Sequence, residues 1–87
     1  MYIHLGLETE VEEKEIVGIF DLDTSTVSKK TREFLAKAEK RKEIISITNE
    51  LPKSFILCNK KGKNTVYISQ LMSSTLQKRA ESKETEF

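Results

Sequence analysis

The chain has 87 residues and nearly balanced charge, with 15 lysines and arginines against 14 aspartates and glutamates. A chain of this length forms one small domain with a thin core, which excludes the two-lobed cleft that many enzymes use. Hydrophobic residues make up 37% and charged residues 33%, which suits a small domain or a subunit that completes its core against a partner. We therefore expect a single domain over residues 1–80 and a polar tail over residues 81–87.

The sequence carries no signal for entering or crossing a membrane. It has no apolar run of about 18 residues, and its N-terminus lacks the basic start and apolar stretch of a signal peptide. The single cysteine, Cys58, lies in the strand-like run FILCN, where a small buried side chain is expected. A catalytic thiol or a metal site would need more partners than His4, the one histidine, supplies. We expect a cytoplasmic protein without a metal or cofactor.

The charges are segregated along the chain. Residues 1–23 carry a net charge of −6, residues 24–42 carry +5, residues 43–80 carry +4 and residues 81–87 carry −2. The middle of the chain is therefore basic between two acidic ends. This distribution is compatible with a local anion-binding face, and equally with basic residues that only solvate one face of a helix.

The N-terminal part of the chain predicts two strands. Residues 2–5 alternate in the manner of a half-buried strand, with Ile3 and Leu5 on one face, and the acidic stretch that follows is typical of a turn or a ragged edge. The continuous apolar run of residues 16–20 predicts a central strand covered on both faces. Gly18 within this run indicates close packing against another element.

The next segment predicts an amphipathic helix. Its Asp, Ser and Thr residues favour a helix start within residues 23–25, and the basic residues 40–42 favour its end because they complement the helix dipole. From there one stripe faces the core and the opposite face carries polar side chains and an alanine. The stripe consists of Val27, Thr31, Phe34, Leu35 and Ala38, and the opposite face carries Lys29, Glu33, Ala36 and Lys40.

The second half of the chain predicts three strands and a loop. Residues 43–48 are rich in β-branched side chains and predict a strand. Residues 49–53 predict a loop, since Pro52 cannot join a central ladder. Residues 54–58 and 65–69 predict the two strands of a hairpin.

The hairpin turn and the end of the chain complete the predicted fold. The turn over residues 59–64 is rich in lysine around Gly62, and residues 73–80 predict a short helix with capping-box spacing between Ser74 and Gln77. Together the elements predict an α+β fold. It would have a small antiparallel or mixed sheet of about five strands, one central amphipathic helix and a short C-terminal helix.

Four blocks follow one another in order along residues 1–80: MYIHLG, IVGIFDLDTSTVSKKTREFL, LPKSF and YISQLMSSTLQKRA. In these blocks the sequence resembles the RemA/RemB family of bacterial extracellular-matrix regulatory proteins, and more closely its RemB-like branch. None of the blocks is a catalytic signature. The resemblance implies a small α+β domain similar to the LytTR type of DNA-binding domain. RemA-like members bind DNA near matrix-operon promoters and assemble into rings, so the resemblance also implies a homo-oligomer.

The chain departs from the RemA-like pattern at positions with which that family contacts DNA. Glu15 stands where RemA-like proteins carry an arginine before the second strand. Glu50 and Leu51 stand where their loop after the third strand carries arginines, and Lys53 is the cation that remains there. The resemblance therefore implies a DNA contact at Lys53 but not at the other three positions.

The sequence gives no sign of an enzyme. An active site would need a nucleophile, a base or paired carboxylates at a defined place. The acids cluster in residues 8–15, in a stretch expected to be exposed, and the serines near residue 73 resemble helix caps rather than nucleophiles. We expect a protein that is not an enzyme.

Two functions remain open. The first is a DNA-binding transcriptional regulator of the extracellular-matrix or biofilm type, a homo-oligomeric ring in which weak lysine–phosphate contacts add up. The second is an oligomeric protein-interaction module that docks a partner or a paralogue without binding DNA, which Glu15, Glu50 and the near-zero net charge favour. The candidate DNA contacts are Lys53, Lys60, Lys61, Lys63, Lys78 and Arg79.

The segregated charges also predict how copies of the chain meet. A head-to-tail contact between an acidic face and a basic face closes into a ring if the rotation fits. The candidate interface residues are Glu8, Glu10, Glu12, Glu13, Lys29, Lys30, Lys37 and Lys40. Duplex DNA and a second copy are thus the expected partners, without a membrane or a small-molecule substrate. Alternatively, the lysine-tipped turn only keeps the hairpin soluble and guards its edge.

Overall fold

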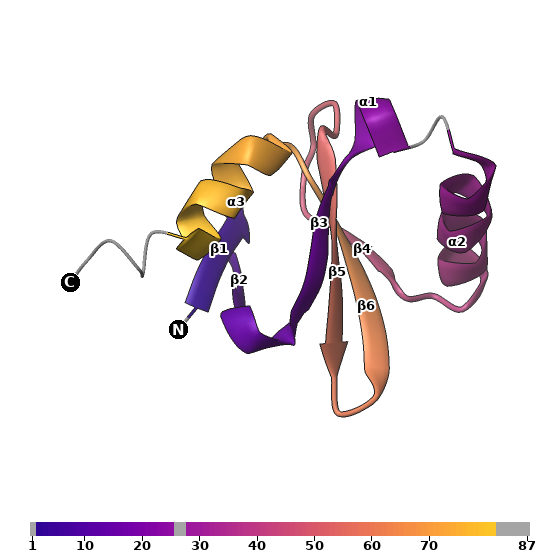
Figure 1. Ribbon diagram of the computed structural model, residues 1–87, viewed down its shortest axis with the longest axis horizontal. Coiled ribbons are helices and arrows are strands. Elements are labelled where there is room, and N and C mark those ends of the chain that lie inside the picture. Colours follow the sequence, from indigo (N-terminus) through magenta and orange to yellow (C-terminus); the bar gives the residue numbers. More distant parts are fainter. Residues whose placement is uncertain (1, 26–27, 82–87) are drawn as a thin grey trace.

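The computed structural model describes residues 2–25 and 28–81, so the predictions for Val27 and for the tail beyond residue 81 lie outside the described residues. The elements are, in chain order, β1 Tyr2–Gly6, β2 Thr9–Glu12, the 3-10 turn η1 Glu13–Glu15, β3 Ile16–Asp21, α1 Leu22–Ser25, α2 Lys29–Lys40, β4 Ile44–Ser46, β5 Ser54–Lys60, β6 Lys63–Ser69 and α3 Ser73–Glu81. They form three layers (Figure 1). A four-stranded sheet lies in the middle, β1, β2 and α3 cover one of its faces, and α2 covers the other.

The strands form two sheets, which corrects the expectation of one sheet of about five strands. The central sheet has the order β3-β5-β6-β4, in which β4 and β6 are parallel and the other neighbours antiparallel. β1 and β2 form a separate two-stranded hairpin. The α+β class is confirmed, and the central sheet is mixed.

The acidic stretch after β1 is a strand, although the sequence analysis predicted a turn or ragged edge there. β2 pairs with β1 so that Val11 stands opposite Ile3, and both side chains are buried. Glu10, next to Val11, points to solvent. Leu7, with φ +45°, lies in the tight turn that joins the two strands. A single buried valine among acids is too weak a pattern to predict a strand, because its stability comes from pairing with β1.

β3 lies at an edge of the central sheet, so the prediction of a central strand covered on both faces was wrong. The register shifts between Ile16 and Gly18, and this bulge leaves Val17 63% exposed. Gly18 is closely packed, but its close neighbour is Phe20 of the same strand and not another element as predicted. A Cβ there would lie 2.6 Å from the ring of Phe20, so the missing side chain lets Phe20 stack on Phe55, with 4.8 Å between ring centroids.

The predicted helix is divided into α1 and α2. The Oδ1 atom of Asp21 accepts a hydrogen bond of 2.7 Å from the Asp23 N–H at the start of α1. α2 begins only after Ser28, so the predicted start within residues 23–25 belongs to the short helix. The stripe of α2 is confirmed at its described positions. Ala38 is buried, Thr31, Phe34 and Leu35 are half-buried, and Lys29, Glu33, Ala36 and Lys40 are exposed.

The remaining predicted elements are confirmed within a few residues. β4, the β5–β6 hairpin and α3 lie where the sequence placed them, and the loop between β4 and β5 contains Pro52. Cys58 is buried at 4% exposure. Ser74 is the second residue of α3, so it is not the cap that begins that helix.

Two apolar clusters join the layers. The hairpin-side cluster lies between the central sheet and β1, β2 and α3, and the α2-side cluster lies beneath α2. The hairpin-side cluster contains the buried residues Ile3, Leu5, Val11, Ile47, Ile56, Cys58 and Leu76. The α2-side cluster contains the buried residues Ala38, Phe55 and Val66, with Leu22, Phe34, Leu35, Ile44, Leu57 and Ile68 half-buried around them.

Buried hydroxyl groups connect the N-terminal strand to the C-terminal half of the chain. The Ser69 hydroxyl donates to the Leu5 carbonyl at 2.6 Å and accepts from the Leu71 N–H at 3.0 Å. The Ser54 hydroxyl donates to the Leu71 carbonyl at 2.7 Å. Because these buried groups are hydrogen-bonded, the cost of removing them from water is offset.

Candidate nucleic-acid interface

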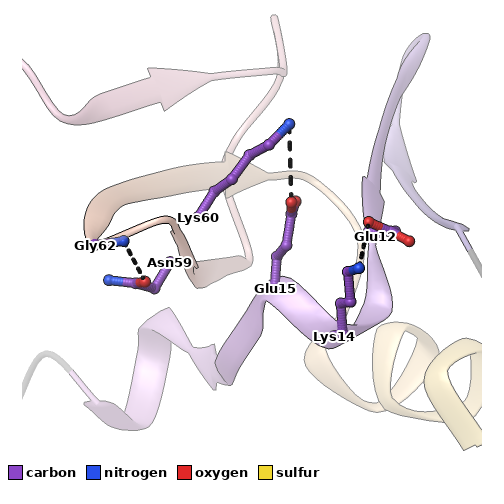
Figure 2. A network of polar contacts seen from close by, with 6 residues as sticks. All are labelled: Glu12, Lys14, Glu15, Asn59, Lys60 and Gly62. Carbon is purple, nitrogen blue, oxygen red and sulfur yellow. Dashed lines mark hydrogen bonds and ion pairs between the residues drawn. The ribbon is translucent and has the colours of Figure 1, made fainter.

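The β5–β6 hairpin presents its lysines on a tight, fixed turn. The last pair of the ladder joins Lys60 to Lys63, and the two turn residues Lys61 and Gly62 have φ angles of +52° and +83°. Two positive φ angles are the signature of the type I′ turn that matches the twist of a hairpin. The Asn59 Oδ1 atom accepts a hydrogen bond of 3.2 Å from the Gly62 N–H (Figure 2).

The tip extends the sheet at the end away from α1 (Figure 1). Lys60, Lys61 and Lys63 are all exposed. Among the residues that the structure describes, Lys61 and Lys63 make no ion pair. At Lys61 and Lys63 the tip therefore offers ammonium groups that an anion can reach without displacing a partner.

The third lysine of the tip faces a carboxylate. The Lys60 Nζ atom lies 3.9 Å from the Glu15 Oε2 atom, and the two side chains point toward one another (Figure 2). Beside them Lys14 pairs with Glu12 at 3.6 Å. A shallow pocket of about 330 Å³ opens between η1 and the hairpin, and it is lined by Glu12, Lys14, Glu15, Asn59, Lys60 and Lys61.

The charge of Glu15 also reaches the edge of the hairpin-side cluster. Burial raises the pKa of the Cys58 thiol to about 11, and the negative charge of Glu15 contributes to the rise. Burial, then the neighbouring Cys58 and Glu15, likewise raises the pKa of Tyr67 above its usual value. Cys58 is therefore a neutral, buried thiol near pH 7, which does not suit a nucleophile.

Lys53 lies at the opposite end of β5 from the tip. The Lys53 N–H donates to the Ser69 carbonyl at 2.9 Å, and its own carbonyl accepts from the Leu22 N–H at 3.0 Å. Its side chain is exposed. At the rise of an extended strand, about 3.3 Å per residue, roughly 25 Å separates Lys53 from Lys61. The structure therefore does not bring this candidate together with the tip.

Lys78 and Arg79 occupy a third place, on α3. Both side chains are exposed. The Arg79 Nη1 atom donates to the His4 carbonyl at 2.8 Å, which joins α3 to β1. The six candidate DNA contacts thus lie in three separate regions of one subunit, and only the tip groups three of them.

The candidate interface residues lie on two opposite sides of the molecule. The glutamates belong to the hairpin side and the lysines to α2, with the central sheet between them (Figure 1). The sheet separates the two sets within one chain. Lys29 instead lies 4.0 Å from Glu33 of its own helix. The acidic members are Glu8, Glu10, Glu12 and Glu13, and the basic members are Lys29, Lys30, Lys37 and Lys40.

The sequence analysis missed the pairing of Glu15 with Lys60. It identified Glu15 only as a charge reversal, because the two residues are far apart in the chain. The signal that could have found the pair is strand register. Antiparallel pairing of β3 with β5 sets Ile16 against Cys58 and so brings the residue before β3 alongside the end of β5.

The described part of the chain contains no group of three or more His, Cys, Asp and Glu residues that could hold a metal ion. Within that same part, no helix is long and apolar enough to cross a membrane.

Comparison with known proteins identifies the family. The family model for RemA-like proteins, described as extracellular matrix regulatory protein A-like, matches residues 2–80. The chain is also 43% identical over 81 residues to Extracellular matrix regulatory protein B of Bacillus subtilis (strain 168), and this alignment covers 93% of the chain and 91% of that protein. The predicted resemblance, including the RemB-like branch, is confirmed. The chain therefore belongs to the RemA-like family of extracellular matrix regulatory proteins.

Proposed function

We propose that this matrix-regulatory protein is a non-enzymatic transcriptional regulator that binds duplex DNA through the tip of its β5–β6 hairpin. The observation that carries the proposal is the fixed type I′ turn, which projects Lys60, Lys61 and Lys63 beyond the sheet. Lysine ammonium groups suit phosphate contacts, whereas bidentate reading of guanine usually falls to arginine. We therefore expect weak sequence preference from one subunit, with selectivity from DNA shape or from the geometry of the assembly.

The proposed form is a homo-oligomeric ring. One subunit groups only three cations at the tip, so its contacts with phosphate are few, and an assembly multiplies them. The placement of the acidic and basic candidate residues on opposite sides of the sheet supports a head-to-tail contact, which closes into a ring when the rotation fits. In this arrangement Lys53, Lys78 and Arg79 are secondary contacts whose use depends on how the subunits sit on DNA.

Salt-dependent titration tests the DNA-binding proposal. Fluorescence anisotropy with a labelled duplex, repeated at several salt concentrations, gives the slope of log affinity against log salt. The double variant Lys61→Gln with Lys63→Gln should flatten this slope by roughly 0.9 per lost contact. The matched control is Arg41→Gln with Lys42→Gln, which removes the same charge from exposed positions outside the candidate sites. An unchanged slope in the tip variant would exclude the tip as the contact.

Light scattering tests the oligomer. The wild-type chain should exceed the monomer mass at micromolar concentration and physiological salt, and Lys37→Glu with Lys40→Glu should lower the mass. Adding Glu8→Lys and Glu10→Lys to that variant should restore it, because the charges are complementary again. A monomeric wild-type chain would exclude the ring.

A protein-interaction module that does not bind DNA is the second candidate. The Glu15–Lys60 pair favours it, because it offsets one of the three tip charges. The loop before β5 also exposes Leu51 to 77% beside Glu50, which suits contact with a protein more than with phosphate. A chain that forms oligomers but leaves the anisotropy of the duplex unchanged at low salt would establish this alternative.

A further inference from the structure

We propose that Glu15 is an internal counter-ion that limits how strongly the hairpin tip binds a polyanion. The inference rests on the proposed function, because the polyanion is duplex DNA. It assigns to one residue the control of the affinity of the tip.

The fold fixes Glu15 beside the tip. Glu15 ends η1, and the next residue, Ile16, pairs with Cys58 of β5. The carboxylate is therefore held at the level of Lys60, with 3.9 Å between Oε2 and Nζ. The Glu15 side chain is 17% exposed and the Lys60 side chain 72%. The acid is thus held in place by its surroundings, while the lysine can swing between the acid and solvent.

The Glu15 carboxylate lies beside two like charges that face one another in the β5–β6 ladder. Lys60 and Lys63 stand directly opposite one another in the last pair of β5 and β6, and like charges at such positions repel. Glu15 offsets the charge of Lys60 and so reduces the repulsion. The consequence for binding is that the tip presents Lys61 and Lys63 without an ion pair to any described residue, and Lys60 with a carboxylate already beside it.

A phosphate and Glu15 therefore compete for Lys60. If Lys60 turns to the phosphate, the ion pair is lost. If Lys60 stays, the carboxylate remains close to the phosphate and repels it. Both routes reduce the affinity of the tip. Exposed ion pairs are individually weak, so the competition changes affinity by a small factor and does not abolish binding.

The variant Glu15→Gln tests the inference because it removes the charge and keeps the size of the side chain. We expect duplex DNA to bind about two- to fivefold more tightly at low salt. The slope of log affinity against log salt should steepen by roughly 0.9, the value for one additional phosphate contact. The matched control is Glu39→Gln, an exposed residue of α2 that neither lines the tip pocket nor belongs to the candidate interface residues, and it should leave the slope unchanged.

A double variant separates this role from a structural one. Glu15→Gln in a Lys60→Gln background should bring no steeper slope, because no cation is left for the substitution to release. A carboxylate that only stabilised the hairpin would raise neither affinity nor slope when removed. Thermal melting followed by circular dichroism checks that each variant is folded. Glu15→Met, of similar length and without charge, replaces Glu15→Gln if the amide is not accommodated.

The outcomes distinguish this inference from the proposed function. If the wild-type chain binds DNA through its tip and Glu15→Gln binds identically, the inference is wrong and the proposed function stands. If only Glu15→Gln binds DNA, the counter-ion role is established and DNA binding by the natural chain is excluded. If neither chain binds, both are overturned.

Discussion

The two faces of the central sheet are covered unequally. On the hairpin side Leu5, Ile56 and Leu76 have no measurable exposure. On the α2 side most apolar side chains are only half-buried, and a pocket of about 270 Å³ remains between α2 and the sheet. It is lined by Phe20, Lys30, Thr31, Phe34, Phe55 and Leu57. The difference teaches that the hairpin side, with β1, β2 and α3, supplies most of the hydrophobic stabilisation, although α2 is the longest helix.

The largest effect on stability should come from a substitution on the hairpin side. Ile56→Ala removes a side chain with 0% exposure from the centre of the hairpin-side cluster. We expect the free energy of unfolding to fall by about 2–5 kcal/mol in urea titration, because the cavity cannot collapse fully. Val17→Ala, at a 63% exposed position, is the control and should change stability by less than about 1 kcal/mol. Equal losses of stability from the two variants would contradict tight packing on the hairpin side.

Ionisation of the Cys58 thiol, on the hairpin side, should lower the free energy of unfolding somewhat less than Ile56→Ala does. The pKa of Cys58 is raised to about 11 in the folded chain, mainly by burial, so the folded state holds this proton more tightly than the unfolded state. Its contribution to stability is complete below the unfolded thiol pKa and disappears as pH rises through about 11. The loss should be at most about 2–3 kcal/mol. Urea titrations at several alkaline pH values should show a shallower decline for Cys58→Ala, and parallel curves would contradict this.

The α2 side should respond more weakly. Phe34→Ala removes a half-buried ring that borders the pocket, so we expect a loss of about 1–2 kcal/mol, smaller than for Ile56→Ala. Thermal melting of both variants in one buffer makes the comparison. A loss of stability as large as that of Ile56→Ala would mean that α2 covers its face of the sheet as tightly as β1, β2 and α3 cover the other face.

The smallest effect should come from the tip. Lys61→Gln with Lys63→Gln should change the free energy of unfolding by no more than about 0.5 kcal/mol, because neither side chain packs or pairs with a described residue. Relief of the Lys60–Lys63 repulsion could make the change slightly favourable. A clear destabilisation in urea would show that these lysines support the fold and would undermine the tip as a surface available for binding.

The sequence predicted the elements whose pattern is local. The alternation in β1, the apolar stripe of α2 and the lysine turn around Gly62 each follow from residues within one element. β2 did not follow, because a single buried valine among acids is a weak pattern, and the edge position of β3 did not follow, because it depends on pairing with β5, which is distant in sequence. The run of residues 16–20 reads as fully covered, but its bulge turns Val17 outward. The start of α2 at Lys29 was missed because the helix-start residues 23–25 belong to the separate short helix α1.

The candidate site was predicted in part for the same reason. Gly62 and its neighbouring lysines lie within one hairpin, so the sequence placed them together. The distance from Lys53 to the tip and the approach of Glu15 to Lys60 depend on the register of β5 with its neighbours. The local sequence pattern therefore predicted the lysines of the tip, whereas Glu15 beside them could be found only from the three-dimensional arrangement.

The bonds that join the two ends of the chain also set the order in which it can fold. Ser69 reaches Leu5 across 64 positions, and Arg79 reaches His4 across 75. During synthesis the β1–β2 hairpin leaves the ribosome well before Leu76, which completes its apolar cover. The apolar face of β1 and β2 therefore stays uncovered until α3 has been made. Contacts of such long range slow folding and leave the nascent chain open to association with other chains.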